Sequence, residues 1–300
     1  MEPWAVAWDG EFRTTDERFG YHRCRACNAL SIFPVPADRL AAIYPPNYND
    51  NLVKGGPVAA IKLWLDRLTL GKLLASIPGR ELRALDIGGG YGLQLDLVRR
   101  LDPRFSETWV ADIDTTARAA AEAKGHRYFL GRVEDFEFER PFDLILMLNL
   151  IEHVADPLAV LQAAFRMLAP GGVVLLKTPN YDSLDARIFR HRNWSGYHCP
   201  RHWVLFDRAA LQRQIQRAGL VVRSFSYTQG APFWAQSVIT NLAELGLLKI
   251  TQERPSNVHP LFGPLAAAFA GLDFLRRPFA KTSQMFLALE KPSGSAGIGG

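Results

Sequence analysis

A cluster of glycines follows an acid at residues 86–92, in the stretch DIGGGYG. Glycine adopts left-handed backbone conformations readily, so such a cluster is expected where the chain turns sharply or lets a ligand approach the backbone. The spacing fits neither a G-x-G-x-x-G dinucleotide fingerprint nor a phosphate-binding G-x-x-x-x-G-K-[ST] loop. It fits D-x-G-x-G-x-G, formed by Asp86, Gly88, Gly90 and Gly92, with Gly89 as a further glycine. We therefore expect a loop whose backbone N–H groups face a ligand.

Later in the sequence, three side chains could perform acid–base chemistry. Glu152 and His153 follow an apolar run in the stretch IEHV, and His202 lies in CPRHWVLF. Histidine titrates near neutral pH, so His153 and His202 are the candidate catalytic residues. Each has a structural alternative: His153 could bond a neighbouring loop, His202 could shape a lid, and Glu152 could orient a loop.

Two cysteines, Cys24 and Cys27, have the C-x-x-C spacing of a metal knuckle. A structural zinc ion needs four ligands, and His22 is too close in sequence and Cys199 too far away to complete the set comfortably. We therefore expect no metal at this pair. A redox role is disfavoured because no thioredoxin-like βαβ unit surrounds it.

Strands alternating with helices are predicted around these residues. RALDI, TWVADI, HRYFLG, FDLILMLN and VVLLKTP read as strands, and the last two are continuously apolar, as in a sheet covered on both faces. This alternation predicts a doubly wound, Rossmann-like α/β sheet over about 80–180. The helix after the glycines is expected to turn Leu93, Leu97 and Leu101 inward, and QMFLALEKP is the expected last strand.

The chain divides into three predicted parts. Residues 1–57 read as an irregular extension because they are rich in turn residues. Residues 58–230 form the predicted core, with a lid insertion at about 181–203. The core begins with an amphipathic helix over 58–77, whose stripe is Ile61, Trp64, Leu65 and Leu68. Residues 231–300 are expected to form a helical cap, the last strand and a disordered tail.

Composition excludes several classes. The 300 residues carry a net charge of +5, 48% are hydrophobic and three are cysteines, which excludes a disulfide scaffold. No apolar run reaches the ~18 residues of a membrane span, and no dense basic run suggests nucleic acid. We expect a cytoplasmic protein.

The glycine loop resembles motif I of class I S-adenosylmethionine-dependent methyltransferases, and further motifs follow in order. The stretch ADID resembles the family's ribose-binding acid, RVEDFEF resembles the segment after its third strand, and residues 142–180 are similar to its fourth-strand region. The resemblance implies a seven-stranded, mostly parallel sheet with S-adenosylmethionine as cofactor. It assigns Asp112 to the two ribose hydroxyls, with Asp114 as the fallback, and Ile113 to the adenine face. It assigns Asp135 to the adenine amino group, with Phe136 beside it, and the backbone around Leu148 to the methionine end.

The same resemblance implies methyl transfer to a small-molecule acceptor, with O-methylation expected. A hydroxyl acceptor needs a base, for which His153 and His202 are the candidates, whereas a neutral amine needs none. Two alternatives stay open: transfer of another group, such as aminopropyl, and a cofactor-binding module without turnover. The expected acceptor is a sugar, a glycan precursor or a quinone-like molecule. The cysteine pair resembles half of a zinc-knuckle element from a subgroup of these enzymes, which suggests saccharide or secondary-metabolite pathways by analogy.

The C-terminal part could also bind partners. Apolar helices predicted over 231–280 are followed by Arg276, Arg277 and Lys281. This pattern suits burial or a homodimer interface first, and peripheral contact with an anionic membrane second. Aromatic residues of the lid, Phe189, Trp194 and Tyr197, could stack on a substrate or pack the lid.

Overall fold

The computed structural model describes residues 1–45, Arg67 and residues 70–292. The predicted stripe Ile61, Trp64, Leu65 and Leu68 lies outside the described residues, as does the predicted disordered tail from residue 293 onward. Residues 70–75 are helical, and the helix ends before Pro78, as predicted. Leu74 and Ile77 from this segment are buried in the core.

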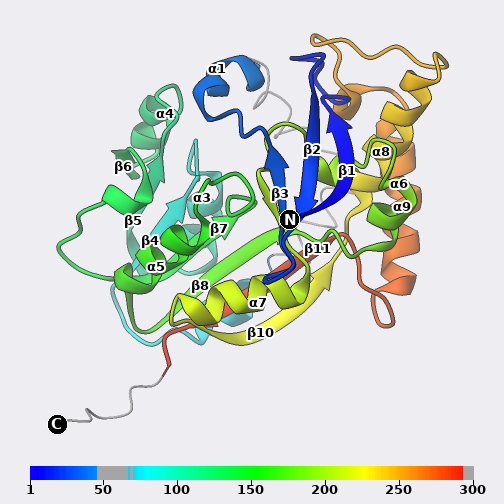
Figure 1. Ribbon diagram of the computed structural model, residues 1–300. Helices are drawn as coiled ribbons and strands as arrows, with labels where there is room; N and C mark the ends of the chain where they lie inside the picture. The colour runs from blue at the N-terminus through cyan, green and yellow to red at the C-terminus, as the bar shows by residue number, and fades with distance from the viewer. Residues whose placement is uncertain (46–66, 68–69, 293–300) are drawn as a thin grey trace.

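A seven-stranded sheet forms the centre of the molecule, in the order β10-β11-β8-β7-β4-β5-β6 (Figure 1). Neighbours from β8 to β6 are parallel, and β11 is antiparallel to both β8 and β10. This confirms the predicted mostly parallel, doubly wound sheet. The strands are β4 (Leu82–Ile87), β5 (Phe105–Asp112), β6 (Arg127–Leu130), β7 (Phe142–Leu148), β8 (Leu168–Pro179), β10 (Val221–Thr228) and β11 (Gln284–Glu290).

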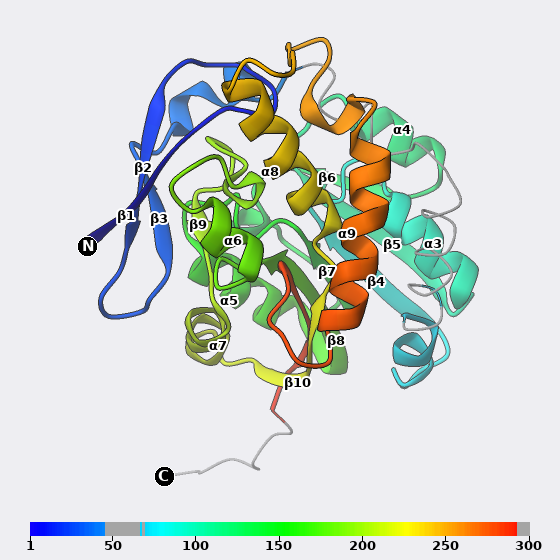
Figure 2. The ribbon, with the colours of Figure 1, turned by 90° about the vertical axis from the view of Figure 1, so that its right-hand side faces the viewer.

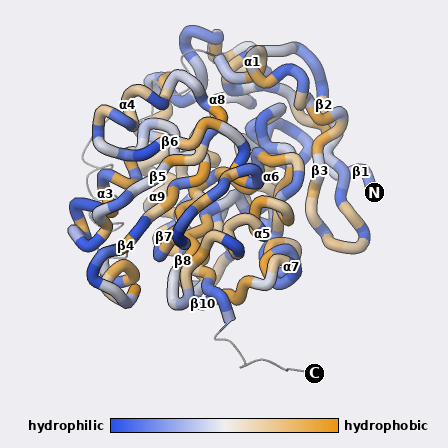
Figure 3. The backbone as a smooth tube through the Cα atoms, turned by 90° about the vertical axis from the view of Figure 1, so that its left-hand side faces the viewer, coloured by the Kyte–Doolittle hydropathy of each residue, from blue (hydrophilic) through white to orange (hydrophobic). Residues whose placement is uncertain are grey.

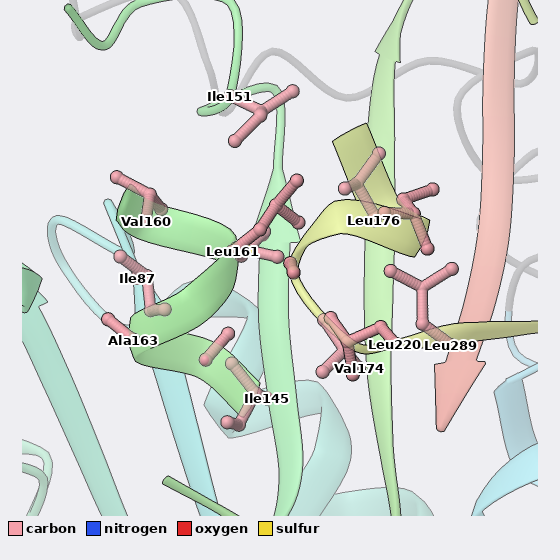
Figure 4. Close-up of a cluster of buried hydrophobic side chains, with 14 of the residues drawn as sticks. Ile87, Ile145, Ile151, Val160, Leu161, Ala163, Val174, Leu176, Leu220 and Leu289 are labelled. Atoms are coloured by element: carbon pink, nitrogen blue, oxygen red, sulfur yellow. The ribbon is translucent and has the colours of Figure 1, made fainter. Parts of the chain in front are cut away.

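Helices cover both faces of this sheet and bury two apolar layers. One layer joins β7 and β8 to α5 (Pro157–Met167) and α7 (Arg208–Arg217), as Figure 4 shows for Ile145, Val160, Leu161 and Leu176. The other joins the opposite face to α3 (Leu93–Leu101) and the segment 70–77, while α4 (Arg118–Ala123) packs near β6. Figure 3 shows the hydrophobic residues concentrated in the central strands.

Helix α3 differs from its prediction. It buries Leu95 and Val98, while Leu93 is 40% exposed and Leu97 and Leu101 are only half-buried. The helix begins at the left-handed Gly92, so Leu93 occupies its first position beside the glycine loop. The four-residue leucine spacing therefore marks a flank of the helix rather than the buried face.

The prediction of an irregular segment at 1–57 is wrong for its first part. β1 (Glu2–Trp8), β2 (Arg18–Arg23) and β3 (Leu30–Phe33) form an antiparallel sheet, which β9 (Val204–Leu205) completes from the lid. Prolines and polar turn residues made this segment read as irregular. The alternating strand residues Ala5, Ala7, Phe19 and Tyr21 face a separate core. Beyond β3 come η1 (Ala37–Arg39) and α1 (Leu40–Ile43).

The lid packs against this N-terminal sheet. It contains α6 (Leu184–Phe189) and η3 (Ser195–Tyr197), and it buries the rings of Trp194 and Tyr197. Tyr197 stacks on Tyr21 with ring centroids 4.6 Å apart, so these lid aromatics serve packing. The guanidinium of Arg201 reaches Asp9 at 2.9 Å, and neither side chain is exposed.

The C-terminal part holds α8 (Ala231–Glu244), η4 (Ser256–Val258) and α9 (Phe262–Arg276) before β11. Figure 2 shows α8 and α9 side by side, with α9 along the outside of the molecule. Phe274 and Phe279 are 65% and 90% exposed. Among the described helices, none is long and apolar enough to cross a membrane.

The buried ion pair between lid and N-terminal sheet generates a stability prediction. Asp9→Ala removes the acceptor for Arg201, Thr14 and the Phe12 amide, which takes the paired carboxylate away from a buried guanidinium. The free energy of unfolding, measured by urea denaturation, should fall by about 3–5 kcal/mol.

A surface pair provides the matched control. Arg118 and Glu122 form an i,i+4 ion pair with both side chains about half exposed. Glu122→Ala should change the unfolding free energy by less than about 1 kcal/mol. Equal effects of the two substitutions would show that the buried pair does not anchor the lid.

Candidate active site

The candidate site lies at one edge of the central sheet. Strand β4 pairs in parallel with both β5 and β7, so the carboxyl ends of these three strands are neighbours. The glycine loop follows β4, Asp112 ends β5, and Leu148 ends β7. Parallel sheets bind ligands at this edge, and the structure brings the predicted motifs together there.

The glycine loop needs its glycines for two different reasons. Gly88, Gly90 and Gly92 have φ values of +73°, +46° and +71°, which disfavour any side chain. A Cβ on Gly89 would lie 2.6 Å from Cγ of Asp86, so the loop folds tightly over that carboxyl group. At Gly90 a Cβ would meet nothing within 4 Å. Open space at Gly90 is therefore where a ligand can touch the backbone.

Asp112 fastens the tip of this loop. Its Oδ2 accepts a hydrogen bond from the Gly90 amide at 2.8 Å, and its Oδ1 accepts one from the Asp114 amide at 3.0 Å. The side chain of Asp114 instead accepts from Thr116 and so serves the following turn. Ile113, between them, is 61% exposed. Asp112 therefore bonds the glycine loop, whereas Asp114, the predicted fallback for the ribose, bonds the following turn.

Asp86 is an unusual buried acid. Its Oδ2 has no hydrogen-bond partner within the described part of the chain. Burial, reinforced by the nearby Asp112 carboxylate, raises the pKa of Asp86 to about 8. An orphaned polar atom under the glycine loop, open space at Gly90 and an exposed Ile113 all fit a bound nucleoside cofactor with a polar, amino-bearing end.

The remaining predicted cofactor residues occupy different surroundings. Asp135 ends the short helix η2 (Val133–Asp135) with an exposed side chain. Phe136 is buried and stacks on Phe129, with ring centroids 4.7 Å apart, so it holds the loop that presents Asp135. Leu148 is half-buried at the end of β7, before Asn149 with a φ of +56°. Their roles toward a cofactor stay predictions.

Two predicted catalytic histidines meet beside this edge although 49 positions separate them in sequence. The rings of His153 and His202 are 4.6 Å apart, edge to face. The Nδ1 atom of His202 lies 2.8 Å from the Gly196 carbonyl, and that of His153 lies 3.1 Å from the Arg201 carbonyl. A carbonyl only accepts hydrogen bonds, so both Nδ1 atoms carry the proton and both Nε2 atoms keep a lone pair.

Burial keeps both imidazoles neutral. It lowers the pKa of His153 to about 3, and the neighbouring His198 contributes. It lowers the pKa of His202 well below its usual value. Both side chains can therefore accept a hydrogen bond or a proton at neutral pH, but neither holds a proton strongly.

Glu152 lies beneath the histidines with its side chain fully buried. Thr178 donates a hydrogen bond to Oε2 at 2.9 Å, whereas Oε1 has no partner among the described residues. Desolvation raises the pKa of Glu152 to about 8, opposed by the Thr178 hydrogen bond and the charge of Lys177. Its backbone carbonyl accepts from the amides of Trp203 and Val204, which joins the IEHV segment to the lid.

Four neighbours of the histidines were not predicted from the sequence as site residues. Tyr44 lies with its hydroxyl oxygen 3.0 Å from Nδ1 of His153, and the imidazole of His198 lies 2.6 Å from Glu11. Arg201 supplies the carbonyl to His153 and pairs with Asp9 through its side chain. The dense aromatic and histidine content of residues 194–203 was a usable indication for His198, but nothing marked Glu11 or Tyr44.

The cysteine pair lies apart from these groups, in the turn between β2 and β3. Cys24 and Cys27 are both partly exposed, and the Asn28 amide donates to the Cys24 carbonyl at 2.8 Å. Cys199 is buried within the lid core. The zinc knuckle suggested by the resemblance has no support from the described residues.

The raised pKa of Asp86 makes stability depend on pH. The folded state keeps a proton that the unfolded state releases near pH 4, so the stability falls as pH rises toward 8 and levels off above it. Asp86→Asn removes this titration. Relative to the wild type, the variant should gain about 2–3 kcal/mol of unfolding free energy between pH 6 and pH 9, measured by denaturation at each pH.

The exposed Asp135 provides the control for that experiment. Asp135→Asn should follow the wild-type stability curve over the same range, because its carboxylate stays in water. Parallel curves for wild type and Asp86→Asn would show that Asp86 is ionised in the folded protein.

Known proteins share this fold and sequence pattern. A tRNA 5-carboxymethoxyuridine methyltransferase of Escherichia coli (strain K12) is 35% identical over 132 residues, 41% of this chain and 48% of that protein. A ubiquinone biosynthesis O-methyltransferase of Xanthomonas campestris pv. campestris is 34% identical over 115 residues, 35% of this chain and 45% of that protein. The chain thus spans about half the length of these curated relatives.

One solved structure supports the fold alone. The crystal structure of the [4+2]-cyclase SpnF is 17% identical with a TM-score of 0.50, covering 75% of this chain and 82% of that one. The family model described as a methyltransferase domain matches residues 61–224, which is more than half of the chain. The chain therefore belongs to this methyltransferase domain family, which confirms the class I S-adenosylmethionine-dependent methyltransferase family predicted from its motifs.

Proposed function

We propose that this protein binds S-adenosylmethionine at the glycine loop and methylates a hydroxyl group of a small-molecule acceptor. The observation that carries the proposal is the contact between Asp112 and Gly90, which places a carboxylate beside open backbone at the carboxyl edge of the sheet. Asp112 would hold the ribose and Ile113 would cover the adenine. Asp135 would accept the adenine amino group, supported by Phe136.

The other end of the cofactor would lie toward Asp86 and Leu148. Asp86 offers an unpartnered oxygen, and Gly88, Gly89, Gly90 and Gly92 let the backbone approach. When bound, the cofactor supplies an activated methyl group on a sulfonium. The protein then has to align the acceptor oxygen and exclude water.

The histidine pair would receive the acceptor hydroxyl. A lone pair on Nε2 of His153 or His202 accepts its hydrogen bond and orients the oxygen. The low pKa of His153 is compatible with this role if the hydroxyl proton leaves after the methyl group has been transferred. An oxygen that has gained a methyl group while keeping its proton is a far stronger acid than any imidazolium, so even a weak base then removes the proton.

A small acceptor suits the enclosure of this site. Glu152 and the lid residue His202 are both buried, and the N-terminal sheet packs on the same lid. A quinone-like or sugar hydroxyl reaches such a position more easily than a folded nucleic acid. The two relatives, one named for a tRNA and one for ubiquinone biosynthesis, leave both acceptor classes to be compared directly.

The cofactor assignment predicts a change in affinity. Asp112→Ala removes the carboxylate proposed for the ribose and the acceptor for the Gly90 amide. Affinity for S-adenosylhomocysteine, measured by calorimetry, should fall at least about 30-fold, because hydrogen bonds to a charged group are worth ~1.5–3 kcal/mol each. Asp114→Ala, two positions away, should change it less than about threefold; the reverse order would assign the ribose to Asp114.

The catalytic assignment predicts a loss of turnover. His153→Ala should lower kcat for transfer of labelled methyl groups by about 10²–10⁴-fold while leaving affinity for S-adenosylhomocysteine intact. His191→Ala, at an exposed lid residue, is the matched control and should keep wild-type kcat. Phenolic quinols, sugar nucleotides and total tRNA form the acceptor panel. Labelling of tRNA alone would overturn the small-molecule proposal.

A further inference from the structure

We propose that Glu152, His153 and His202 form a binding site for a divalent transition-metal ion such as Mn²⁺, Co²⁺ or Zn²⁺. Each residue offers one ligand atom, and these atoms all lie within 4.8 Å of one another. The set of two imidazoles and one carboxylate is a donor combination that suits borderline divalent metals and leaves coordination positions open. A bound ion would use the same imidazoles that the proposed function assigns to the acceptor hydroxyl, so any effect on the acceptor rests on the function proposed above.

The distances are compatible with one ion. Metal–ligand bonds of about 2.0–2.2 Å place two ligands of the same ion roughly 3–4 Å apart. Nε2 of His202 and Oε1 of Glu152 are 3.9 Å apart, which is too long for a hydrogen bond between them but within this range. The other ligand atoms lie within 4.8 Å, so small side-chain shifts would complete the triad.

The histidines are oriented as metal ligands are. Each uses its Nδ1–H on a backbone carbonyl, Gly196 for His202 and Arg201 for His153. A hydrogen bond of this kind fixes the tautomer and aims the Nε2 lone pair, as is usual for metal-bound histidine. The Nε2 lone pair of His202 therefore lies beside Oε1 of Glu152 without any change of tautomer, and His153 offers its own ligand atom within the same 4.8 Å cluster.

The carboxylate supplies the independent observation. Glu152 is fully buried, and its Oε1 has no hydrogen-bond donor in the part of the chain that the structure describes. Leaving a buried carboxylate oxygen unpaired is costly. A cation at the triad would pair with it, while Thr178 continues to donate to Oε2.

Acidic side chains balance the cationic groups near the triad. The guanidinium of Arg201 acts on both histidines, and it pairs at 2.9 Å with the buried carboxylate of Asp9, which offsets its positive charge. On the other side, His198 is held by Glu11 at 2.6 Å, and its ring centroid lies 5.0 Å from that of His202. The surrounding acids thus offset the positive charge near the proposed ion.

Metal binding to untagged, metal-stripped full-length protein tests the proposal. Cys24→Ser/Cys27→Ser is used as the background, since the exposed thiols could bind the same ions. Titration with Co²⁺, followed by calorimetry and visible absorption, should give one ion per chain with d–d bands and no thiolate charge-transfer band. Thermal denaturation should shift upward with Mn²⁺ or Co²⁺.

Two variants and a control locate the ion. Glu152→Gln keeps the shape of the side chain, and His202→Ala removes one imidazole; each should weaken Co²⁺ affinity more than about 100-fold, since even outer-shell partners are worth roughly 10–100-fold. His191→Ala should bind as the background does. Absence of stoichiometric Co²⁺ binding by the background protein would overturn the proposal. So would Glu152→Gln and His202→Ala variants that fold by circular dichroism and bind Co²⁺ as tightly as the background does.

The same preparations separate this inference from the proposed function. S-Adenosylhomocysteine is titrated into the metal-stripped and Co²⁺-loaded background protein. Binding of S-adenosylhomocysteine without Co²⁺ binding would reject the metal site alone. Co²⁺ binding without S-adenosylhomocysteine binding would reject the proposed function and leave the metal site in place.

Discussion

The buried ion pair between Arg201 and Asp9 is the interaction on which the candidate catalytic half depends. The side chain of Arg201 is fixed by Asp9, which belongs to the N-terminal segment. Its carbonyl orients His153, and the next residue in the chain is His202. Arg201 therefore links the positions of both imidazoles to that of the N-terminal sheet. Separating a guanidinium from its carboxylate at this depth would cost several kcal/mol, so the arrangement tolerates little displacement.

The cofactor half follows a different constraint, the register of parallel strands. Pairing of β4 with β5 and β7 brings the glycine loop, Asp112 and Leu148 to one edge without help from the lid. Two buried acids with raised pKa, Asp86 and Glu152, lie along this same edge. Each keeps an oxygen without a partner among the described residues. These unpartnered oxygens thus lower the stability of the folded protein at the positions where ligands would supply the missing interactions.

Sequence reasoning reached the cofactor half because its determinants are local. The glycines and Asp112 sit in short motifs, and continuous apolar strands predict a covered parallel sheet. It failed at the N-terminal sheet, since Ala5 and Ala7 carry little hydrophobic pattern and the fourth strand, Val204–Leu205, comes from the lid. It also placed Leu93 inward, where the loop geometry turns it out. The partners Glu11, Asp9 and Tyr44 are set by tertiary packing, which short motifs do not encode.

The pairing of β3 with β9 has a consequence for synthesis of the chain. Leu30 pairs with Leu205, and 175 positions separate them. A ribosome adding about 5–20 residues per second needs roughly 10–35 s to cover that stretch. During this interval the nascent chain carries β3 as an open edge and Asp9 without its guanidinium. Emergence of the segment around Arg201 from the exit tunnel, rather than completion of the first hairpin, therefore sets the earliest moment at which the N-terminal sheet can close.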